Sequence, residues 1–415
     1  MNGEPLRILL YEHVSGGGFA EEPIPNSLLC EGFGMLRSVV SDFKAAGHRV
    51  TVLLDSRLSA LKAPLDFDNL VTIASKGEVE TALDKVSDHA DAFYVIAPEQ
   101  NQVLQSMVNW VERKGLLSLN CPSSGIEKAA NKASLYERAE KIGLHTPKTR
   151  LFSLLENTDK ITSAINDEIG FPVVVKPVSG SGCGGLSLVK HSSEIEAAIG
   201  KVKRDAASEC FMVQELIDGV AASVTLFSSG GKAVPVSLNQ QDVILGPPES
   251  ASNYFGGVVP LDSHMRQEAF ASAKKFVESH GDLKGYVGVD LVLTKNAAFV
   301  VDINPRLTTS YVGLRKVARF NLAEALLNAV LKSKLPKDAG TSGYSCFSKV
   351  AVSNPSVAAL QKSFKSPEVV SPPFILKNEN ESLALVESHG ATIQDARFKL
   401  GEAKKGLQRL CRGGD

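Results

Sequence analysis

The chain has 415 residues, of which 43% are hydrophobic and 22% are charged, and its formal net charge is −1. This length predicts about three domains, and the balanced charge gives no reason to expect nucleic acid or an anionic membrane as a partner. No apolar run approaches the roughly 18 residues that a membrane helix requires, and the N-terminal residues look like the start of a strand, not a signal peptide. The six cysteines include no CxxC pair and the eight histidines no HExxH motif, so we expect reduced thiols in a cytoplasmic protein without structural zinc.

The first 120 residues have the strand, loop, helix, strand order of an α/β unit. A buried strand is predicted over 6–11, a helix over 26–46 and a second strand over 48–54. A glycine loop follows the first strand at its carboxyl end, where open sheets bind ligands; its glycines are Gly16, Gly17 and Gly18. Backbone N–H groups of such a loop can hold a carboxylate, although a plain connection is equally consistent with the sequence.

Three charged side chains follow in the next part of the chain. Glu99 comes after a strand predicted over 91–96, and it could bind an ammonium group, although a surface acid is at least as common. A helix predicted over 126–142 carries Lys128 and Lys132 on one face. Each lysine alone is most often a solvated surface charge.

A glycine-rich turn between two strands is a candidate phosphate-binding lid. The strand predicted over 171–176 ends at Lys176, directly before this turn. The small residues of the turn include Ser181, Gly182, Gly184 and Gly185. Their unhindered backbone N–H groups can fold over phosphates. Glycine loops also serve as linkers, but a lysine at the end of the preceding strand favours the phosphate site. The segment has no GxxxxGK[ST] pattern, so it is not a Walker A loop.

A strand predicted over 211–217 offers a site for a nucleotide base. Backbone groups of such a strand can hydrogen-bond an adenine edge while apolar side chains cover its faces. The residues placed to do so are Gln214, Glu215, Leu216, Ile217 and Asp218. Farther along, a long loop is predicted over 246–257, and a loop of this length in a compact region is usually functional or disordered.

The central feature of the sequence is a hairpin predicted over 287–303. Each strand carries one acid, Asp290 or Asp302, and a carboxylate in an apolar run is costly unless it is paired or bound to a cation. Asn304 and Arg306 continue the alternation of Asp302 and therefore point to the same face. Two carboxylates and an amide oxygen suit Mg²⁺ with bound phosphates. Each acid alone is equally consistent with a water-facing residue, but the ordered set favours the metal site.

The pattern weakens after a helix predicted over 321–331. Short strands are predicted over 347–352, 374–376 and 383–386, followed by a charged helix over 392–410. We interpret this C-terminal part as an accessory subdomain without recognisable chemistry.

These motifs, in this order, resemble the ATP-grasp ligases over roughly residues 121–331. The resemblance implies that Lys132 and Lys176 contact ATP phosphates under the glycine lid and that the strand at 214–217 holds adenine. It implies that Asp290, Asp302 and Asn304 bind Mg²⁺, with Mn²⁺ as an alternative. Arg306 would act on the transferred phosphate, so that Arg306 and Lys176 are the catalytic residues.

A narrower resemblance spans most of the first 330 residues. The segments APE at 97–99, FGG at 255–257, GYVGVD at 285–290 and INPR at 303–306 look like the tyramine glutamate ligases of methanofuran biosynthesis. It implies an enzyme that joins the γ-carboxyl of glutamate to tyramine or a related aromatic amine through an acyl phosphate. The residues that would select the substrates are Gly16, Gly17, Gly18, Glu99, Tyr254, Gly256, Gly257 and Thr308.

Two positions depart from the ATP-grasp pattern. Many relatives carry an acid after the adenine strand that binds the ribose hydroxyls, where this chain has Ala221 and Ala222; Asp218 is a candidate substitute. The second metal-binding acid is commonly glutamate, and Asp302 is one methylene shorter. Oxygen ligation survives this change, but the bridging geometry shifts.

The fold class implied is α/β (α+β) with an ATP-grasp architecture. We expect a parallel N-terminal domain over 1–120, a small subdomain with the lid over 121–210, a metal-binding subdomain over 211–335 and the accessory subdomain over 336–415, with antiparallel sheets in the nucleotide-binding region. The expected partners are ATP, Mg²⁺, an amino acid and an amine, without nucleic acid or membrane, and a homodimer stays open. Two alternatives remain: another amino-acid ligase on the same scaffold, and a nucleotide-binding regulator without catalysis, for which Ala221-Ala222 is the only hint.

Overall fold

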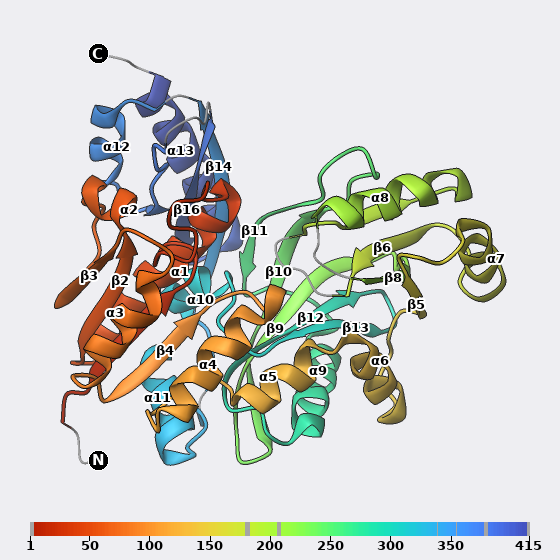
Figure 1. Ribbon diagram of the computed structural model, residues 1–415, viewed down its shortest axis with the longest axis horizontal. Coiled ribbons are helices and arrows are strands. Elements are labelled where there is room, and N and C mark those ends of the chain that lie inside the picture. The colour runs from red at the N-terminus through yellow and green to blue at the C-terminus, as the bar shows by residue number, and fades with distance from the viewer. Residues whose placement is uncertain are drawn as a thin grey trace.

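The computed structural model describes residues 4–178, 183–205, 209–337, 339–353, 355–376 and 381–412. Within these ranges the strands form two four-stranded sheets and one eight-stranded sheet. In Figure 1 the N-terminal sheet lies at the left and the second four-stranded sheet at the right, with strands of the eight-stranded sheet between them. The combination of a parallel N-terminal sheet with antiparallel sheets confirms the predicted fold class.

The N-terminal sheet has the strand order β3-β2-β1-β4, and its neighbouring strands are parallel. The strands are β1 (Arg7–Glu12), β2 (Arg49–Asp55), β3 (Asn69–Ile73) and β4 (Ala92–Ile96). Ile8 and Leu10 of β1 share a core with α1 (Asn26–Ala45), whereas Leu9 belongs to the core on the opposite face with α4 (Val103–Arg113). Because alternate residues of a strand face opposite sides, a strand covered on both faces is a continuous apolar run.

The second sheet is antiparallel and has the strand order β5-β8-β6-β7. The strands are β5 (Thr149–Ser153), β6 (Val173–Pro177), β7 (Ser187–Val189) and β8 (Cys210–Glu215), and the covering helices are α7 (Thr158–Glu168) and α8 (Ile195–Asp205). Val173 and Val175 pack in the core beneath these helices, whereas Val174 and Lys176 line a cavity on the other face. The alternation along β6 therefore separates packing residues from site residues.

The eight-stranded sheet is antiparallel and has the order β13-β12-β9-β10-β11-β14-β16-β15. Its strands are β9 (Val220–Ser229), β10 (Lys232–Ile244), β11 (Asn253–Val259), β12 (Gly285–Leu293), β13 (Ala298–Asn304), β14 (Tyr344–Ser353), β15 (Val369–Ser371) and β16 (Glu381–Gly390). The predicted hairpin is β12 and β13, and its register places Asp290 opposite Asp302. Helix α9 (Arg266–His280) shares the core on one face of this hairpin.

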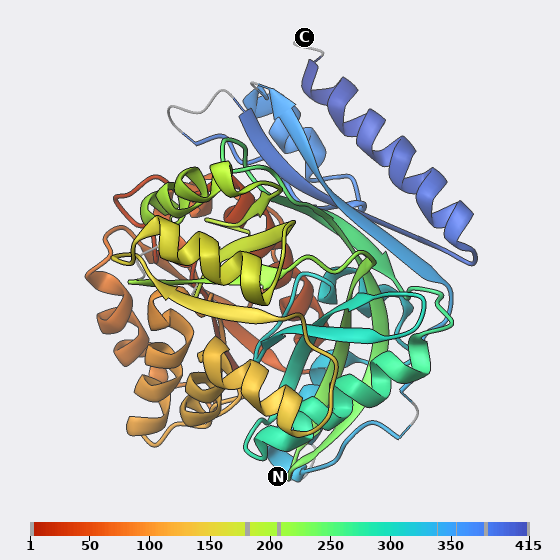
Figure 2. The ribbon, with the colours of Figure 1, turned by 90° about the vertical axis from the view of Figure 1, so that its right-hand side faces the viewer.

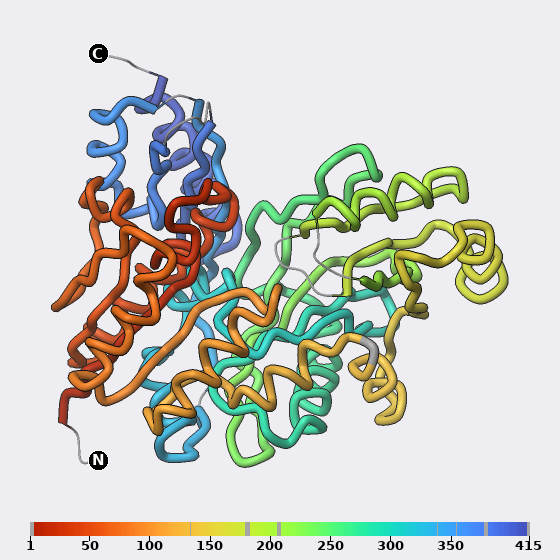
Figure 3. Tube along the Cα trace, viewed as in Figure 1, coloured from red at the N-terminus to blue at the C-terminus, as the bar shows by residue number. Residues whose placement is uncertain are grey.

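The C-terminal residues extend the eight-stranded sheet. β14 pairs with β11, and β16 and β15 follow it, so the sheet continues past residue 336, where the sequence predicts a subdomain boundary. α13 (Ile393–Arg412) lies along the outside of β14 and β16 (Figure 2). α1 contacts β15 and β16, so segments from the two ends of the chain lie side by side (Figure 3).

Three predicted elements differ from the structure. The helix predicted over 126–142 is two helices, α5 (Ser123–Ala130) and α6 (Lys132–Lys141), because the intervening Asn131 leaves helical geometry and accepts a hydrogen bond from a backbone N–H of α6. The loop predicted over 246–257 is shorter, since β11 begins at Asn253. The short strand predicted over 374–376 is wrong, and β15 covers 369–371 instead.

The remaining helices connect or cover the sheets. They are α2 (Ser56–Leu61), α3 (Glu78–Ser87), α10 (Tyr311–Val317), α11 (Leu322–Lys332), α12 (Val357–Ser363) and the 3₁₀ turns η1 (Gln100–Gln102) and η2 (Ser192–Glu194). None of the helices in the described ranges has both the length and the apolarity needed to span a membrane.

The close approach of β11 to β14 depends on Gly256. Its φ is +141°, and a Cβ at this position would lie 2.0 Å from the carbonyl oxygen of Phe347 on β14. We expect Gly256→Ala to lower the free energy of unfolding by roughly 2–4 kcal/mol, because the new atom forces the strands apart. Urea unfolding followed by circular dichroism measures this change.

The matched control is Gly401→Ala in α13, where a Cβ meets no atom within 4 Å. Alanine is preferred in a helix by roughly 0.5–1 kcal/mol, so this variant should be slightly more stable than the wild type. Equal stability of Gly256→Ala and the wild type would show that the β11–β14 spacing does not require glycine.

Candidate active site

A cavity of about 540 Å³ lies between the second four-stranded sheet and the eight-stranded sheet. The predicted site residues that line it are Lys132, Lys176, Gly184, Gln214, Glu215, Leu216, Ile217, Asp218, Tyr254, Asp290, Asp302, Asn304, Arg306 and Thr308. Residues predicted from separate stretches of the sequence therefore face one space. Those that do not line it are Gly16, Gly17, Gly18, Glu99, Gly185, Gly256 and Gly257, while Ser181 and Gly182 lie outside the described residues.

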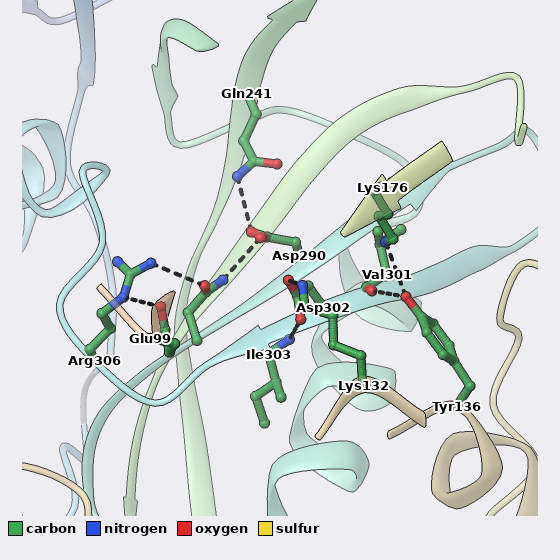
Figure 4. A network of polar contacts seen from close by, with 11 residues as sticks. Glu99, Lys132, Tyr136, Lys176, Gln241, Asp290, Val301, Asp302, Ile303 and Arg306 are labelled. Carbon is green, nitrogen blue, oxygen red and sulfur yellow. Dashed lines mark hydrogen bonds and ion pairs between the residues drawn. The ribbon is translucent and has the colours of Figure 1, made fainter. Parts of the chain in front are cut away.

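The two acids of the hairpin lie opposite each other on β12 and β13. Asp290 accepts hydrogen bonds from the side-chain amides of Gln241, at 3.0 Å, and Asn304, at 2.9 Å. Asp302 contacts the Lys132 ammonium group and accepts a bond from the Ile303 N–H (Figure 4). The acids therefore share one neighbourhood, with a lysine bound to one of them.

Lys176 approaches the same acids from the second four-stranded sheet. Its ammonium group donates to the hydroxyl of Tyr136 at 3.1 Å, and that hydroxyl donates to the carbonyl of Val301 at 2.8 Å (Figure 4). Tyr136 lies on α6, one turn after Lys132. One helix therefore places Lys132 directly and holds Lys176 through a tyrosine.

Burial and charge act in opposite directions on these groups. Burial, followed by repulsion from Asp302, raises the pKa of Asp290 to about 6. Burial would also raise the pKa of Asp302, but Lys132 and Lys176 outweigh it and hold that pKa below its ordinary value. Burial alone would lower the pKa of Lys132, but attraction and hydrogen bonding to Asp302, with smaller effects of Tyr136 and Glu99, together outweigh burial and raise that pKa. The site therefore contains a strongly ionised lysine–aspartate pair beside an acid whose charge is under-compensated.

The donor set of the hairpin fits a hard divalent cation. Two partly buried carboxylates and the amide oxygen of Asn304 provide oxygen ligands, which are the ligands that Mg²⁺ prefers in proteins. A cation would also relieve the repulsion that raises the Asp290 pKa. No group of three or more His, Cys, Asp or Glu side chains with metal-binding geometry occurs in the part of the chain that the structure describes, so these two acids and an amide are the relevant donors.

Arg306 is held by Glu99. Its Nε donates to the Glu99 carboxylate at 2.8 Å, and its Nη1 donates to the carbonyl of Leu307 at 3.0 Å. The sequence suggested Glu99 as a ligand for an ammonium group, but the structure places it behind Arg306 and away from the cavity lining. The geometry makes Glu99 a positioning group for the guanidinium.

The strand end at Gln214 to Asp218 forms the opposite end of the cavity. The Gln214 side chain donates to Thr149 at 2.9 Å, and the Glu215 N–H donates to the carbonyl of Lys148 at 2.8 Å. Val174 and Val292 line the cavity beside these residues. The apolar walls at this end suit a flat aromatic base.

The loop at Gly16 to Gly18 is occupied by the protein itself. The carboxylate of Glu12, 2% exposed, accepts bonds from the Val14 N–H at 3.0 Å, the Ser15 N–H at 2.7 Å and the Ser15 hydroxyl at 2.6 Å. The N–H groups of Gly16 and Gly18 donate to carbonyls within the same turn. The loop does hold a carboxylate, but the carboxylate comes from the end of β1 and not from a substrate.

Gly256 and Gly257 do not line the cavity; they are glycines because neighbouring strands pack too closely for a side chain. A Cβ on Gly257 would lie 2.2 Å from the Gln240 carbonyl oxygen, and one on Gly256 would collide with β14. Tyr254 on the same strand does line the cavity. The predicted substrate loop is thus a strand that presents a tyrosine.

Several residues of the site were not predicted from the sequence. Tyr136 follows Lys132 at helical spacing, so the period of the helix could have revealed it. Gln241 belongs to a strand whose alternate residues face the cavity. Glu31 and Thr309 also line the cavity, and nothing local in the sequence distinguishes Glu31 from other acids of an amphipathic helix.

Comparison with protein families agrees with this geometry. Residues 129–310 match the ATP-grasp domain family, and residues 48–126 match the pre ATP-grasp 3 domain family. The tyramine–L-glutamate ligase of Methanocaldococcus jannaschii is 29% identical over 339 residues, which cover 79% of this chain and 92% of that protein.

Solved structures show the same fold. The biotin carboxylase domain of the 2-oxoglutarate carboxylase of Hydrogenobacter thermophilus, in complex with magnesium ADP and bicarbonate, has a TM-score of 0.72 at 12% identity, covering 96% of this chain and 90% of that one. The L-amino acid ligase of Bacillus licheniformis has a TM-score of 0.65 at 15% identity, covering 96% of this chain and 97% of that one. At these identities the likeness concerns the fold alone.

The buried Glu12 predicts a pH dependence of stability. Burial raises its pKa to about 7, against an ordinary value of 4.5, although three hydrogen bonds oppose the shift. The folded protein therefore keeps this proton longer than the unfolded chain, and the stabilisation is lost as the pH rises from about 4.5 through 7. Between pH 5 and 8 the free energy of unfolding of the wild type should fall, relative to that of Glu12→Gln, by on the order of 2–3 kcal/mol.

Urea unfolding at several pH values measures this difference. Glu22→Gln, which removes an exposed acid paired with Lys76, is the control and should follow the wild type at every pH. Parallel curves for the wild type and Glu12→Gln would show that Glu12 is ionised in the folded protein throughout this range.

Proposed function

We propose that this chain is an ATP-dependent, amide-forming ligase of the ATP-grasp superfamily and that it joins the γ-carboxyl of glutamate to tyramine or a related aromatic amine. The observation that carries the proposal is the convergence of Lys132, Lys176 and the Asp290–Asp302 pair in one cavity. The choice of substrates is supported by the similarity to a tyramine–L-glutamate ligase over 92% of its length.

ATP fits along the length of the cavity. Its base would bind at Gln214 to Ile217, between apolar residues such as Val174 and Val292. Asp218 lies at this end and is available to the ribose hydroxyls, whereas Ala221 offers no polar group there. The phosphates would then extend toward Lys176 and Lys132, whose positive charges offset those of the triphosphate.

Asp290, Asp302 and Asn304 would hold Mg²⁺. When bound, the ion neutralises charge on the phosphate oxygens and orients them for transfer. Lys132 is paired with Asp302, so the lysine and the metal-binding residues are positioned together. Mn²⁺ has similar ligand preferences and is expected to substitute.

The chemistry proceeds in two balanced steps. The γ-carboxylate oxygen of glutamate attacks the γ-phosphorus of ATP, the bond to the β-phosphate oxygen breaks, and ADP leaves with its electron pair. The neutral amine then attacks the carbonyl carbon of the acyl phosphate, the carbon–oxygen bond breaks, and inorganic phosphate and a proton are released with the amide. Arg306, fixed by Glu99, is placed to stabilise negative charge that develops on the transferred group.

A screen for ADP release tests the proposed function. The protein is incubated with ATP and Mg²⁺ and with amino acids and amines, alone and in pairs, and a coupled assay records ADP. Release that requires both L-glutamate and tyramine, together with the amide detected by mass spectrometry, supports the proposal. Release with another pair only would exclude these substrates, and ATP binding without release by any pair would favour a regulator.

Lys176 provides a residue-level prediction. Lys176→Met removes a buried charge beside the phosphates, so the rate of ADP release should fall roughly 100-fold or more. Lys128→Met is the matched control, because Lys128 forms a surface pair with Asp282 and does not line the cavity. Its rate should equal that of the wild type. An unchanged rate in Lys176→Met, with an unchanged urea midpoint in both variants, would remove Lys176 from the reaction.

A further inference from the structure

Glu31 lines the cavity but is not used by the proposed nucleotide and metal sites. The acids that line the cavity in the described residues are Glu31, Glu215, Asp218, Asp290 and Asp302. Glu215 and Asp218 belong to the base end, and Asp290 and Asp302 belong to the proposed metal site. Glu31 comes from α1 in the N-terminal part of the chain, so it enters the cavity from a different element.

The carboxylate of Glu31 is firmly held. One oxygen accepts a hydrogen bond from the Thr309 hydroxyl at 2.6 Å, and the other contacts the ammonium group of Lys349. The exposed fractions of the Glu31 and Lys349 side chains are 13% and 8%. An ionised carboxylate has about four acceptor sites. Oε1, which contacts Lys349, is fully buried, so a further donor from the cavity would bind to Oε2, which also accepts from Thr309.

Lys349 supports this arrangement from behind. It lies on β14, donates to the Ser27 hydroxyl at 2.7 Å and sits 5.6 Å from the centre of the Tyr254 ring. Glu31 and Tyr254 line the cavity, but Lys349 does not. Lys349 therefore holds Glu31 and Tyr254, which would contact a substrate, although Lys349 itself does not line the cavity.

Glu31 lies on the side of the cavity where the acceptor would bind. Thr309, its hydrogen-bond partner, follows Arg306 and Thr308 along the chain, and all three line the cavity. Burial and then the negative charge of Glu31 raise the pKa of Tyr254. Burial alone would lower the pKa of Arg306, but Glu99, then Asp290 and Glu31, outweigh it and raise that pKa. The acid therefore lines the cavity beside the chain segment that carries Arg306 and Thr308.

We infer that Glu31 binds the α-ammonium group of the amino-acid substrate and that Lys349 is the positioning residue that holds Glu31 in place. This inference rests on the proposed ligase function and names the subsite that selects an α-amino acid over a simple carboxylic acid. A buried, pre-oriented carboxylate binds a cationic ammonium group strongly, and a site built for that group disfavours an analogue that lacks it. Tyr254 and Thr309 complete the wall around this subsite.

Direct binding tests the assignment without turnover. Titration calorimetry compares L-glutamate with glutarate, which has the same two carboxylates but no ammonium group, in the presence of Mg²⁺ and a nonhydrolysable ATP analogue. The wild type should bind L-glutamate roughly tenfold to hundredfold more tightly than glutarate. Glu31→Gln should bind the two compounds within about threefold of each other, while its affinity for the ATP analogue stays unchanged.

Glu22→Gln is the matched control, since Glu22 is also paired with a lysine in the N-terminal part but is exposed. It should keep the wild-type preference. Equal affinity of the wild type for L-glutamate and glutarate, no measurable binding of L-glutamate, or a preference retained in Glu31→Gln would each overturn the assignment.

The ratio of the affinities for L-glutamate and glutarate also tests the role of Lys349. Lys349→Met should reduce the preference for L-glutamate and raise the KM for the amino acid while leaving the KM for ATP unchanged. Lys349→Arg, which keeps the charge if the methionine variant fails to fold, should restore much of the preference. A loss of turnover with the ratio and both KM values unchanged would assign Lys349 to structure alone.

The two proposals fail in different ways. ADP release with L-glutamate and tyramine, combined with equal binding of L-glutamate and glutarate, would keep the ligase function and reject the Glu31 subsite. A glutamate preference that disappears in Glu31→Gln, combined with no ADP release by any pair, would keep the subsite and reject the ligase.

Discussion

The site depends on two like charges that the fold places on adjacent strands. The register of β12 and β13 sets Asp290 opposite Asp302, and both are largely buried. Such a pair is tolerated only where cations approach it. Lys132 meets this requirement for Asp302 directly, whereas the hydrogen-bond donors to Asp290 among the described residues are the side-chain amides of Gln241 and Asn304. The imbalance leaves a local excess of negative charge, which favours the proposed binding of a metal ion at the hairpin.

The break between α5 and α6 brings the positive charge of Lys132 to Asp302. A single helix would carry Lys128 and Lys132 on one face, but the structure interrupts it at Asn131, so that Lys132 begins a new helix. Lys128 then pairs with Asp282 at the surface, while Lys132 contacts Asp302. The same short helix carries Tyr136, whose hydroxyl accepts a hydrogen bond from Lys176. One local change of backbone direction therefore positions contacts to charged residues on two different sheets, Asp302 and Lys176.

The sequence predicted the arrangement of the hairpin's polar residues correctly because that information is local. Alternation along a strand places Asp302 and Asn304 on one face, and the turn fixes the register that brings Asp290 beside them. Other features were hidden because they arise from distant contacts. β11 looked like a loop because of its glycines, which the structure requires for close strand packing. The Gly16 to Gly18 loop looked vacant because nothing in the sequence showed that Glu12 folds back into it. Glu31 becomes part of the cavity only through Thr309 and Lys349.

The two ends of the cavity are therefore built in different ways. The proposed phosphate-binding residues include those of one hairpin and one short helix, and the register of the hairpin is set by neighbouring residues. The far end joins α1 to β14, from opposite ends of the chain, through a lysine that does not line the cavity. This connection exists only because β14 extends the same sheet that carries the hairpin. The C-terminal strands thus carry the residue that supports Glu31, whereas the hairpin carries the proposed metal site, so that the proposed substrate selection and phosphate transfer rest on different parts of one sheet.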